Sequence, residues 1–260
     1  MGKINVSPAL VLRHVNYRDA DRIVTLFTRD HGLIAGIARG IRRSVKRFGG
    51  RLDLFTLVEV TFRTGRGLHH LESATLLDAH MGIRSDLLRI AWAAYLSEMV
   101  EKLFGEEQAH EAAFATLLSA MKFLSGAPDP DEGALRTVEL ALLMEAGYRP
   151  ELDACVVCRR PVREGGRFRF VVTRGGCVCG RCPGGEGGLE VSETLCTVMS
   201  RAVESLEGGL EPLRLPGASL QQLRALLGAF ESYHLGVRLK SAPMLHDLLQ
   251  ESSSVPRPRG

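Results

Sequence analysis

Two cysteine pairs, Cys155-Val-Val-Cys158 and Cys179-Gly-Arg-Cys182, stand twenty residues apart in the second half of the chain. Each C-x2-C pair places two thiols on one tight turn, and two such pairs supply the four ligands of a tetrahedral zinc site. Four thiolates fill the coordination shell and leave no position for a reactive water. The sequence therefore predicts a structural Zn²⁺ held by Cys155, Cys158, Cys179 and Cys182, in a module over residues 151–190.

The other two cysteines have different expected roles. Cys177 lies two residues before Cys179 and competes with it as the fourth ligand. Cys196 falls inside a later apolar pattern, and we expect it to be a small core residue. Disulfides or buried free thiols are the alternative for the two pairs. Because the N-terminal residues show no secretory signal pattern, we expect a reducing, cytoplasmic setting, in which metal binding is favoured.

Charge is distributed unevenly in a chain of otherwise ordinary composition. The 260 residues are 45% hydrophobic and 24% charged, which is typical of a globular protein with a full core. Residues 1–80 carry 13 Lys and Arg against 7 Asp and Glu, whereas the remainder carries 20 against 23. The positive charge thus belongs to the first 80 residues.

These first 80 residues have the pattern of a small β-domain. Leu54, Thr56, Val58, Val60 and Phe62 alternate with the opposite face, as a half-buried strand requires. Short segments rich in Val, Ile, Leu, Phe and Thr predict five strands, at residues 9–15, 22–28, 33–38, 54–62 and 68–77. Five strands with no long helical pattern between them indicate a closed barrel, for which the OB-fold is the expected architecture.

A basic segment, residues 39–51, lies between the third and fourth predicted strands. It has six Lys and Arg residues, no acidic residue, several glycines and Phe48. Such a segment attracts a phosphate backbone, and an aromatic ring can stack on an unpaired base. The alternative is a solvated loop without a ligand. We predict that DNA is bound by Arg39, Arg42, Arg43, Lys46, Arg47 and Arg51, with Phe48 as the stacking residue.

After residue 80 the apolar period becomes helical. Ser85 is the expected N-cap of the first helix, Ser219 with Gln222 forms an expected capping box, and Trp92 is an expected core residue. We predict an α+β protein: an OB-fold barrel over residues 1–80, and an α-helical bundle over 81–150 and 191–250 into which the four-cysteine zinc module is inserted. Residues 251–260, with three serines and two Pro-Arg pairs, are an expected disordered tail. The first predicted helix has its apolar pattern over residues 88–103, between the cap Ser85 and a stop at Gly105. The other predicted helices span residues 114–124, 135–146, 192–206, 220–235 and 241–249.

The order of these parts resembles the RecO family of bacterial recombination mediator proteins. The resemblance is carried by residues 21–32, 38–43, 142–150, 168–182, 233–236 and 240–245. It implies an N-terminal OB-fold, a helical bundle and a zinc module, and by position it favours Cys179 and Cys182 over Cys177 as ligands. It further implies binding of single- and double-stranded DNA, annealing of complementary strands, and partnership with RecR in helping RecA displace single-stranded-DNA-binding protein.

Two other classes of function are weighed against a mediator. A zinc-containing transcription regulator would read base sequence, but no stretch resembles a short helix-turn-helix. A metal-dependent hydrolase or deaminase would need an open metal site; His70-Leu-Glu72 matches part of a deaminase signature, yet Ala154 precedes Cys155 where that signature has proline. We therefore expect no enzymatic activity and no catalytic residue, and a protein associated with the nucleoid in the cytoplasm.

Overall fold

The computed structural model describes residues 2–41, 48, 50–205 and 217–254. The chain divides into two compact units, one formed by Met1–Pro128 with Leu239–Gly260 and the other by Asp129–Arg238. Among the described residues, every helix is too short or too polar to cross a bilayer.

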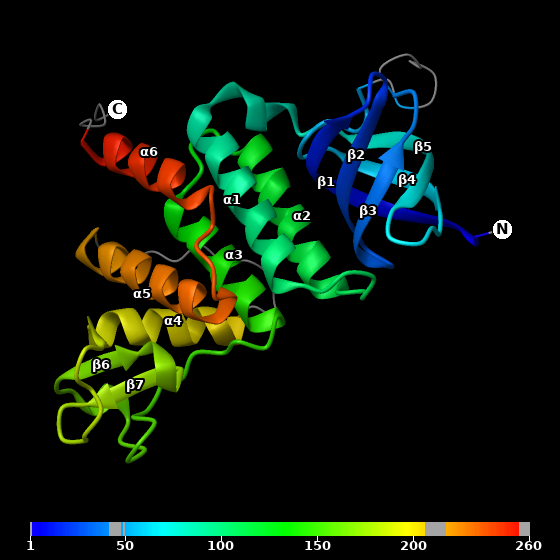
Figure 1. The fold of residues 1–260 in the computed structure, drawn as a ribbon. Helices are drawn as coiled ribbons and strands as arrows, with labels where there is room; N and C mark the ends of the chain where they lie inside the picture. Colours follow the sequence, from blue (N-terminus) through cyan, green and yellow to red (C-terminus); the bar gives the residue numbers. More distant parts are fainter. Residues whose placement is uncertain (1, 42–47, 49, 206–216, 255–260) are drawn as a thin grey trace. The chain divides into compact units, whose positions relative to one another are not determined.

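The first unit contains a closed five-stranded barrel (Figure 1). Its strands follow the order β1-β2-β3-β5-β4, with β1 also pairing with β4, so the barrel has no open edge. β3 and β5 run parallel, and every other neighbouring pair is antiparallel. This order is that of an OB-like barrel, and the predicted fold class is confirmed. The strands are β1 (Ile4–Tyr17), β2 (Asp21–Thr28), β3 (Gly32–Ala38), β4 (Leu57–Arg63) and β5 (His69–Asp78).

Side chains from all five strands fill the barrel interior. On β4, Val58, Val60 and Phe62 are buried while Glu59 is exposed, as the period of two predicts. The parallel β3–β5 pair closes the barrel where Gly36 passes Leu71, and a Cβ at Gly36 would stand 2.5 Å from the leucine side chain. Other buried members of this core include Val11, Val24, Leu26, Ile34, Phe48, Leu52 and Ala74.

Three helices complete the first unit: α1 (Leu87–Leu103), α2 (Glu111–Gly126) and α6 (Ala242–Ser254). α1 packs against α2, α6 and β1, and Trp92 is buried on it as predicted. The N-cap of α1 is Asp86, whose carboxylate accepts a hydrogen bond from the Leu88 amide at 3.0 Å. The predicted cap, Ser85, is wrong because it closes the short 3-10 helix η1 (Met81–Ser85) and donates to the Gly82 carbonyl.

The start of α6 is held by α1. The Glu98 carboxylate accepts hydrogen bonds from the Lys240 and Ser241 amides at 2.9 and 2.8 Å, and from the Ser241 hydroxyl at 2.6 Å. These contacts and buried Leu245 and Leu249 anchor the helix, which continues to Ser254. Residues 251–254 of the expected disordered tail are therefore helical, and residues 255–260 lie outside the described part of the chain.

The second unit combines three helices with a small antiparallel sheet (Figure 1). α5 packs against α3, α4 and β8. The predicted capping box of α5 is wrong, because the helix already begins at Gly217 and Ser219 lies within it; the Gln222 side chain instead accepts from the Ser192 amide. The elements are α3 (Glu132–Glu145), η2 (Val162–Glu164), β6 (Phe168–Val171), η3 (Val172–Arg174), β7 (Gly176–Cys179), β8 (Leu189–Val191), α4 (Glu193–Ser205) and α5 (Gly217–Leu235).

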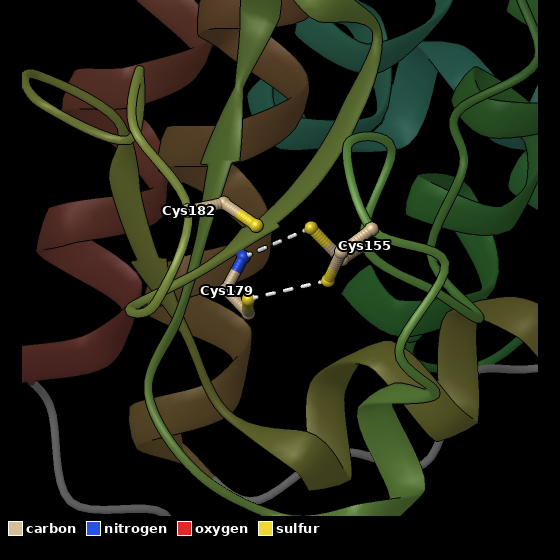
Figure 2. A group of neighbouring side chains, drawn as sticks. Cys155, Cys179 and Cys182 are labelled. Atoms are coloured by element: carbon tan, nitrogen blue, oxygen red, sulfur yellow. Dashed lines mark hydrogen bonds between the residues drawn. The ribbon is translucent and has the colours of Figure 1, made fainter.

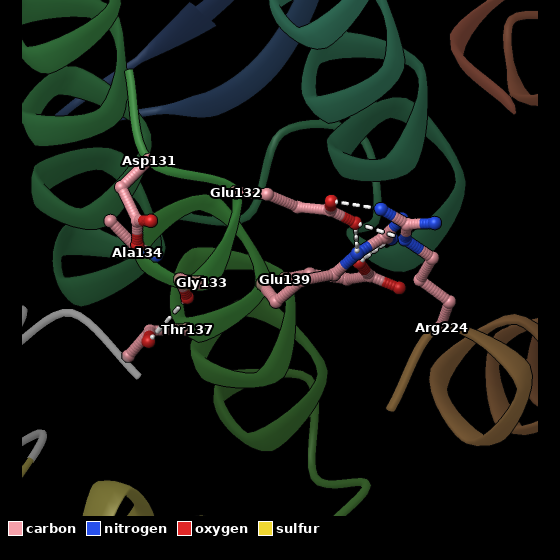
Figure 3. A network of polar contacts seen from close by, with 8 residues as sticks. Asp131, Glu132, Gly133, Ala134, Thr137, Glu139 and Arg224 are labelled. Carbon is pink, nitrogen blue, oxygen red and sulfur yellow. Dashed lines mark hydrogen bonds and ion pairs between the residues drawn. The ribbon is translucent and has the colours of Figure 1, made fainter. Parts of the chain in front are cut away.

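An ionic network joins α3 to α5 (Figure 3). Arg224 of α5 donates to both carboxylate oxygens of Glu132, at 2.6 and 2.5 Å. Glu132 also pairs with Arg136, which donates to Glu139 at 2.6 Å. Because Glu139 is fully buried and Arg136 nearly so, these opposite charges compensate one another out of contact with water.

Candidate metal centre and nucleic-acid interface

The two cysteine pairs lie on turns whose backbone hydrogen bonds define two knuckles. In the first, the Arg159 amide donates to the Cys155 carbonyl at 2.8 Å; in the second, the Cys182 amide donates to the Cys179 carbonyl at 3.0 Å. Gly176 allows β7 to pass close to the first knuckle, since a Cβ there would stand 2.7 Å from both Glu151 and Val156. Sequence spacing alone could not show this close approach of the two turns.

The four sulfur atoms of these pairs converge. Those of Cys155, Cys158, Cys179 and Cys182 all lie within 4.8 Å of one another, and Figure 2 shows the cluster from close by with three of the four residues labelled. The Cys158 and Cys179 sulfurs are 3.7 Å apart. In a tetrahedral site with Zn–S bonds of about 2.3 Å, neighbouring sulfurs stand about 3.8 Å apart. The donor set and its spacing therefore fit a tetrahedral metal ion.

Backbone amides prepare part of this cluster for a cation. Burial opposes ionisation of the Cys155 thiol, but the amides of Cys158, Cys179 and Val157 donate to its sulfur and lower its pKa to about 6. The Cys179 amide donates at 3.3 Å. A hydrogen bond with Cys158, followed by burial, raises the pKa of Cys182 to about 12. Since thiolates crowded together repel one another, a bound divalent cation would be needed to keep all four ionised.

Cys177 lies apart from this group. Its sulfur is 3.8 Å from that of Cys196 on α4, and both residues are buried. The structure therefore brings Cys179, and not Cys177, together with the other three cysteines. The prediction that Cys196 is a core residue is confirmed. That it contacts Cys177 could not be read from the sequence, because a strand and a helix bring the two residues together.

The basic segment begins and ends at fixed points of the barrel. At its start, the Gly40 amide donates to the Asp21 carboxylate at 2.8 Å, and Arg39 is exposed. At its end, the half-buried Arg51 donates from its guanidinium to the Ala74 carbonyl at 3.2 Å. Arg42, Arg43, Lys46 and Arg47 lie outside the described residues. The six residues remain a predicted DNA interface.

The predicted role of Phe48 as a stacking residue is wrong. Its side chain is fully buried and belongs to the barrel core with Val58, Val60 and Leu52. A nucleic-acid base cannot reach a ring in that position, so Phe48 holds the basic segment to the barrel. The glycines around it suggested an exposed loop, whereas hydrophobic burial of the ring determined its place.

Comparisons with known proteins cover both units. A family model described as "Recombination protein O N terminal" matches residues 2–80, and one described as "Recombination protein O C terminal" matches residues 84–243. The chain belongs to the RecO family. The barrel is its N-terminal part, and the C-terminal match contains both knuckles. The RecO resemblance inferred from six short stretches is thereby confirmed.

Several similar RecO proteins extend over nearly the same length. A "DNA repair protein RecO" of Anaeromyxobacter sp. (strain Fw109-5) is 39% identical over 244 residues, covering 92% of this chain and 94% of the relative. That of Anaeromyxobacter dehalogenans (strain 2CP-C) is 39% identical over 247 residues, with the same coverage. That of Symbiobacterium thermophilum is 36% identical over 242 residues, covering 92% and 95%.

Proposed function

We propose that this RecO-family chain acts in recombinational DNA repair as a DNA-binding mediator. It would bind single- and double-stranded DNA at the nucleoid, anneal complementary strands, and act with RecR to promote loading of RecA. The relatives described above are DNA repair proteins by name. The observation that carries the proposal is a segment with six basic residues and no acidic residue, attached at Gly40 and Phe48 to a closed OB-like barrel.

Charge neutralisation is the physical basis of the proposed annealing. Lys and Arg side chains along the segment offset phosphate charge and release counterions, which lowers the repulsion between two strands. Base pairing then supplies the driving force, so neither nucleotide hydrolysis nor a catalytic residue is needed. Because Phe48 is buried, the described part of the segment offers phosphate contacts rather than base stacking. Binding should therefore be independent of sequence.

The test is strand annealing by the full chain carrying Arg42→Glu with Arg43→Glu. A charge-matched control carries Arg149→Glu with Arg163→Glu, two exposed arginines of the second unit. We expect wild type and control to accelerate annealing of unrelated oligonucleotide pairs without ATP or divalent metal, and the Arg42/Arg43 variant to lose this acceleration. Six phosphate contacts on a single strand predict a log–log salt slope of about −4, and a shallower slope in the variant.

Three outcomes would contradict this proposal. Unchanged annealing by the Arg42/Arg43 variant would place the DNA contact elsewhere. Strong preference for one oligonucleotide sequence would favour the transcription regulator instead. Shortened strands would indicate nuclease activity.

We infer further that the four-cysteine cluster holds a structural Zn²⁺. Thiolates are preferred ligands of this ion, and four of them complete its usual coordination shell. Cys155 and Cys158 would be joined through the ion to Cys179 and Cys182, which tie the first knuckle to β7. The zinc supplies folding free energy to the module and takes no part in DNA chemistry.

Metal analysis of the purified chain tests the zinc assignment. We expect one zinc per chain, lost in Cys155→Ser and in Cys179→Ala but kept in Cys177→Ala, which serves as the matched control two residues away. Structural zinc contributes on the order of 10 kcal/mol in small modules, so the variants that lose zinc should also exchange amide hydrogens faster over residues 150–190. Retention of zinc by Cys179→Ala would refute the ligand assignment, and wild-type protein without zinc would refute the site.

A further inference from the structure

A second pair of thiols lies outside the four-cysteine cluster. The Cys177 sulfur on β7 faces the Cys196 sulfur on α4 at 3.8 Å, and both side chains are almost fully shielded from solvent. Neither sulfur belongs to the group that could hold a metal. The proposed function gives these two residues no role, although a thiol is the most easily oxidised polar group in a protein core.

The backbones that carry the two thiols are held in place. Cys177 pairs with Phe170 of β6, and its amide donates to the Glu151 carbonyl at 2.9 Å. Cys196 lies in the first turn of α4, where its amide donates to the Ser192 carbonyl at 3.1 Å. The Ser192 hydroxyl in turn accepts from the Leu195 amide at 3.2 Å, as an N-cap does. The sulfurs therefore meet through fixed secondary structure rather than through a chance arrangement of loops.

A pocket of about 430 Å³ has Cys196 in its wall. Its lining also includes Thr197 and Ser200 of α4 and Asp153 and Val162 from the segment that carries the first knuckle. The Ser200 hydroxyl is buried without a hydrogen-bond partner among the described residues. A molecule the size of hydrogen peroxide fits this space many times over and would find polar groups there to bind. Cys196 lines this pocket and is 2% exposed, whereas Cys177 is 0% exposed and is not among the lining residues. A small oxidant that enters the pocket therefore meets Cys196 first.

We propose that Cys177 and Cys196 form a reversible disulfide when a hydroperoxide enters this pocket. The Cys196 sulfur attacks one peroxide oxygen, the O–O bond breaks, and the departing oxygen leaves as water with the thiol proton. Cys196 is then a sulfenic acid. The Cys177 sulfur attacks the Cys196 sulfur, the S–O bond breaks, and a second water leaves. Two thiols and one hydrogen peroxide thus give one disulfide and two waters, and a dithiol reductant restores the thiols.

The sulfurs must approach from 3.8 Å to the bonded distance of about 2.05 Å, which is a small movement between side chains already in contact. The bond would tie β7, whose last residue is Cys179, to α4. It would also lower the conformational entropy of the unfolded chain, because it closes a loop from residue 177 to residue 196. We therefore expect the oxidised module to be more resistant to unfolding and to retain its metal.

The test uses the full-length, zinc-loaded chain treated with a few equivalents of hydrogen peroxide and digested without reduction. Mass mapping should find one cross-linked peptide pair, joining Cys177 to Cys196, with the mass of two hydrogens lost. Zinc measured in the same samples should stay bound, and the melting temperature of the second unit should rise by roughly 10 °C. Treatment with a dithiol should remove the cross-link and return the melting temperature to that of the untreated protein.

Cys196→Ala serves as the matched variant, since it removes one member of the pair and leaves the four-cysteine cluster intact. Under peroxide it should show neither the cross-link nor the rise in melting temperature. The proposal is overturned if the wild-type chain forms disulfides among Cys155, Cys158, Cys179 and Cys182 with loss of zinc while Cys177 and Cys196 stay reduced. It is equally overturned if both thiols remain free after every other oxidisable residue has reacted. Both of these outcomes are measured on the wild-type chain, so they do not depend on whether the variant folds.

Discussion

Replacing Arg224 by methionine should destabilise the second unit by about 3 kcal/mol. The Arg224 side chain is 20% exposed and its partner Glu132 is 12% exposed, so the pair is largely removed from water. Without Arg224, the Glu132 carboxylate loses two hydrogen bonds and keeps its ion pair with Arg136, which also pairs with Glu139. Removing one partner of a buried pair costs about 3–5 kcal/mol, and we take the lower limit because Arg136 still contacts Glu132.

Hydrogen exchange of peptides from α3 and α5 measures this loss directly. A destabilisation of about 3 kcal/mol should speed exchange of the most protected amides roughly a hundredfold. The double variant Arg224→Met with Glu132→Gln restores the charge balance, and we expect it to recover about 2 kcal/mol. Trp92 is buried in the first unit, so its fluorescence follows unfolding of that unit. The variant should leave this transition unchanged, and a shift would show that the substitution destabilises the whole protein.

Arg169→Met is the matched control in the same unit. Arg169 pairs with Glu190 at 3.3 Å, but the two side chains are 45% and 74% exposed. An exposed pair contributes about 0–1 kcal/mol, so this variant should exchange almost as slowly as wild type. If Arg224→Met and Arg169→Met give the same exchange rates, the network does not stabilise the packing of α3 against α5 and the reasoning from burial fails.

Two further predictions concern the anchoring of α6 and of the small sheet. Burial alone would raise the pKa of Glu98, but its hydrogen bonds from Ser241 and Lys240 lower it below the usual value. This carboxylate therefore contributes stability that is present above its unfolded pKa and is lost as pH falls through the lower folded value. Glu98→Gln should lower the free energy of unfolding by about 1 kcal/mol at pH 7. In urea unfolding, this difference between variant and wild type should shrink below about pH 4. A difference that does not change with pH would exclude ionisation of Glu98 as the cause. The Phe230 ring of α5 contacts the Phe170 ring of β6 edge-on, with 5.6 Å between the ring centroids. Phe230→Ala should therefore cost about 3–5 kcal/mol of stability and speed amide exchange in β6, while zinc stays bound. If the variant also loses its zinc, the small sheet and the metal cluster depend on the same packing and the prediction is wrong.

Local patterns in the sequence were sufficient for most elements of the fold. Alternation at Val58, Val60 and Phe62 predicted β4, because a strand with one buried face needs a period of two. The two C-x2-C pairs predicted a four-sulfur cluster, since each pair forms its own turn. The locations of the helices followed from apolar residues at intervals of three and four. The helix ends did not follow from this period, because caps such as Asp86 compete with equally suitable neighbours such as Ser85.

Contacts between distant residues were decided by the tertiary structure alone. The parallel pairing of β3 with β5 sets the barrel order, yet nothing in either segment specifies its neighbour. Phe48 resembles a stacking residue in the sequence and is a core residue in the barrel. The sequence marked Cys177 as a competing ligand and Cys196 as a core residue, but their contact arises only where β7 meets α4. Such contacts depend on which surfaces are buried together, and burial is a property of the whole packed unit rather than of any short stretch.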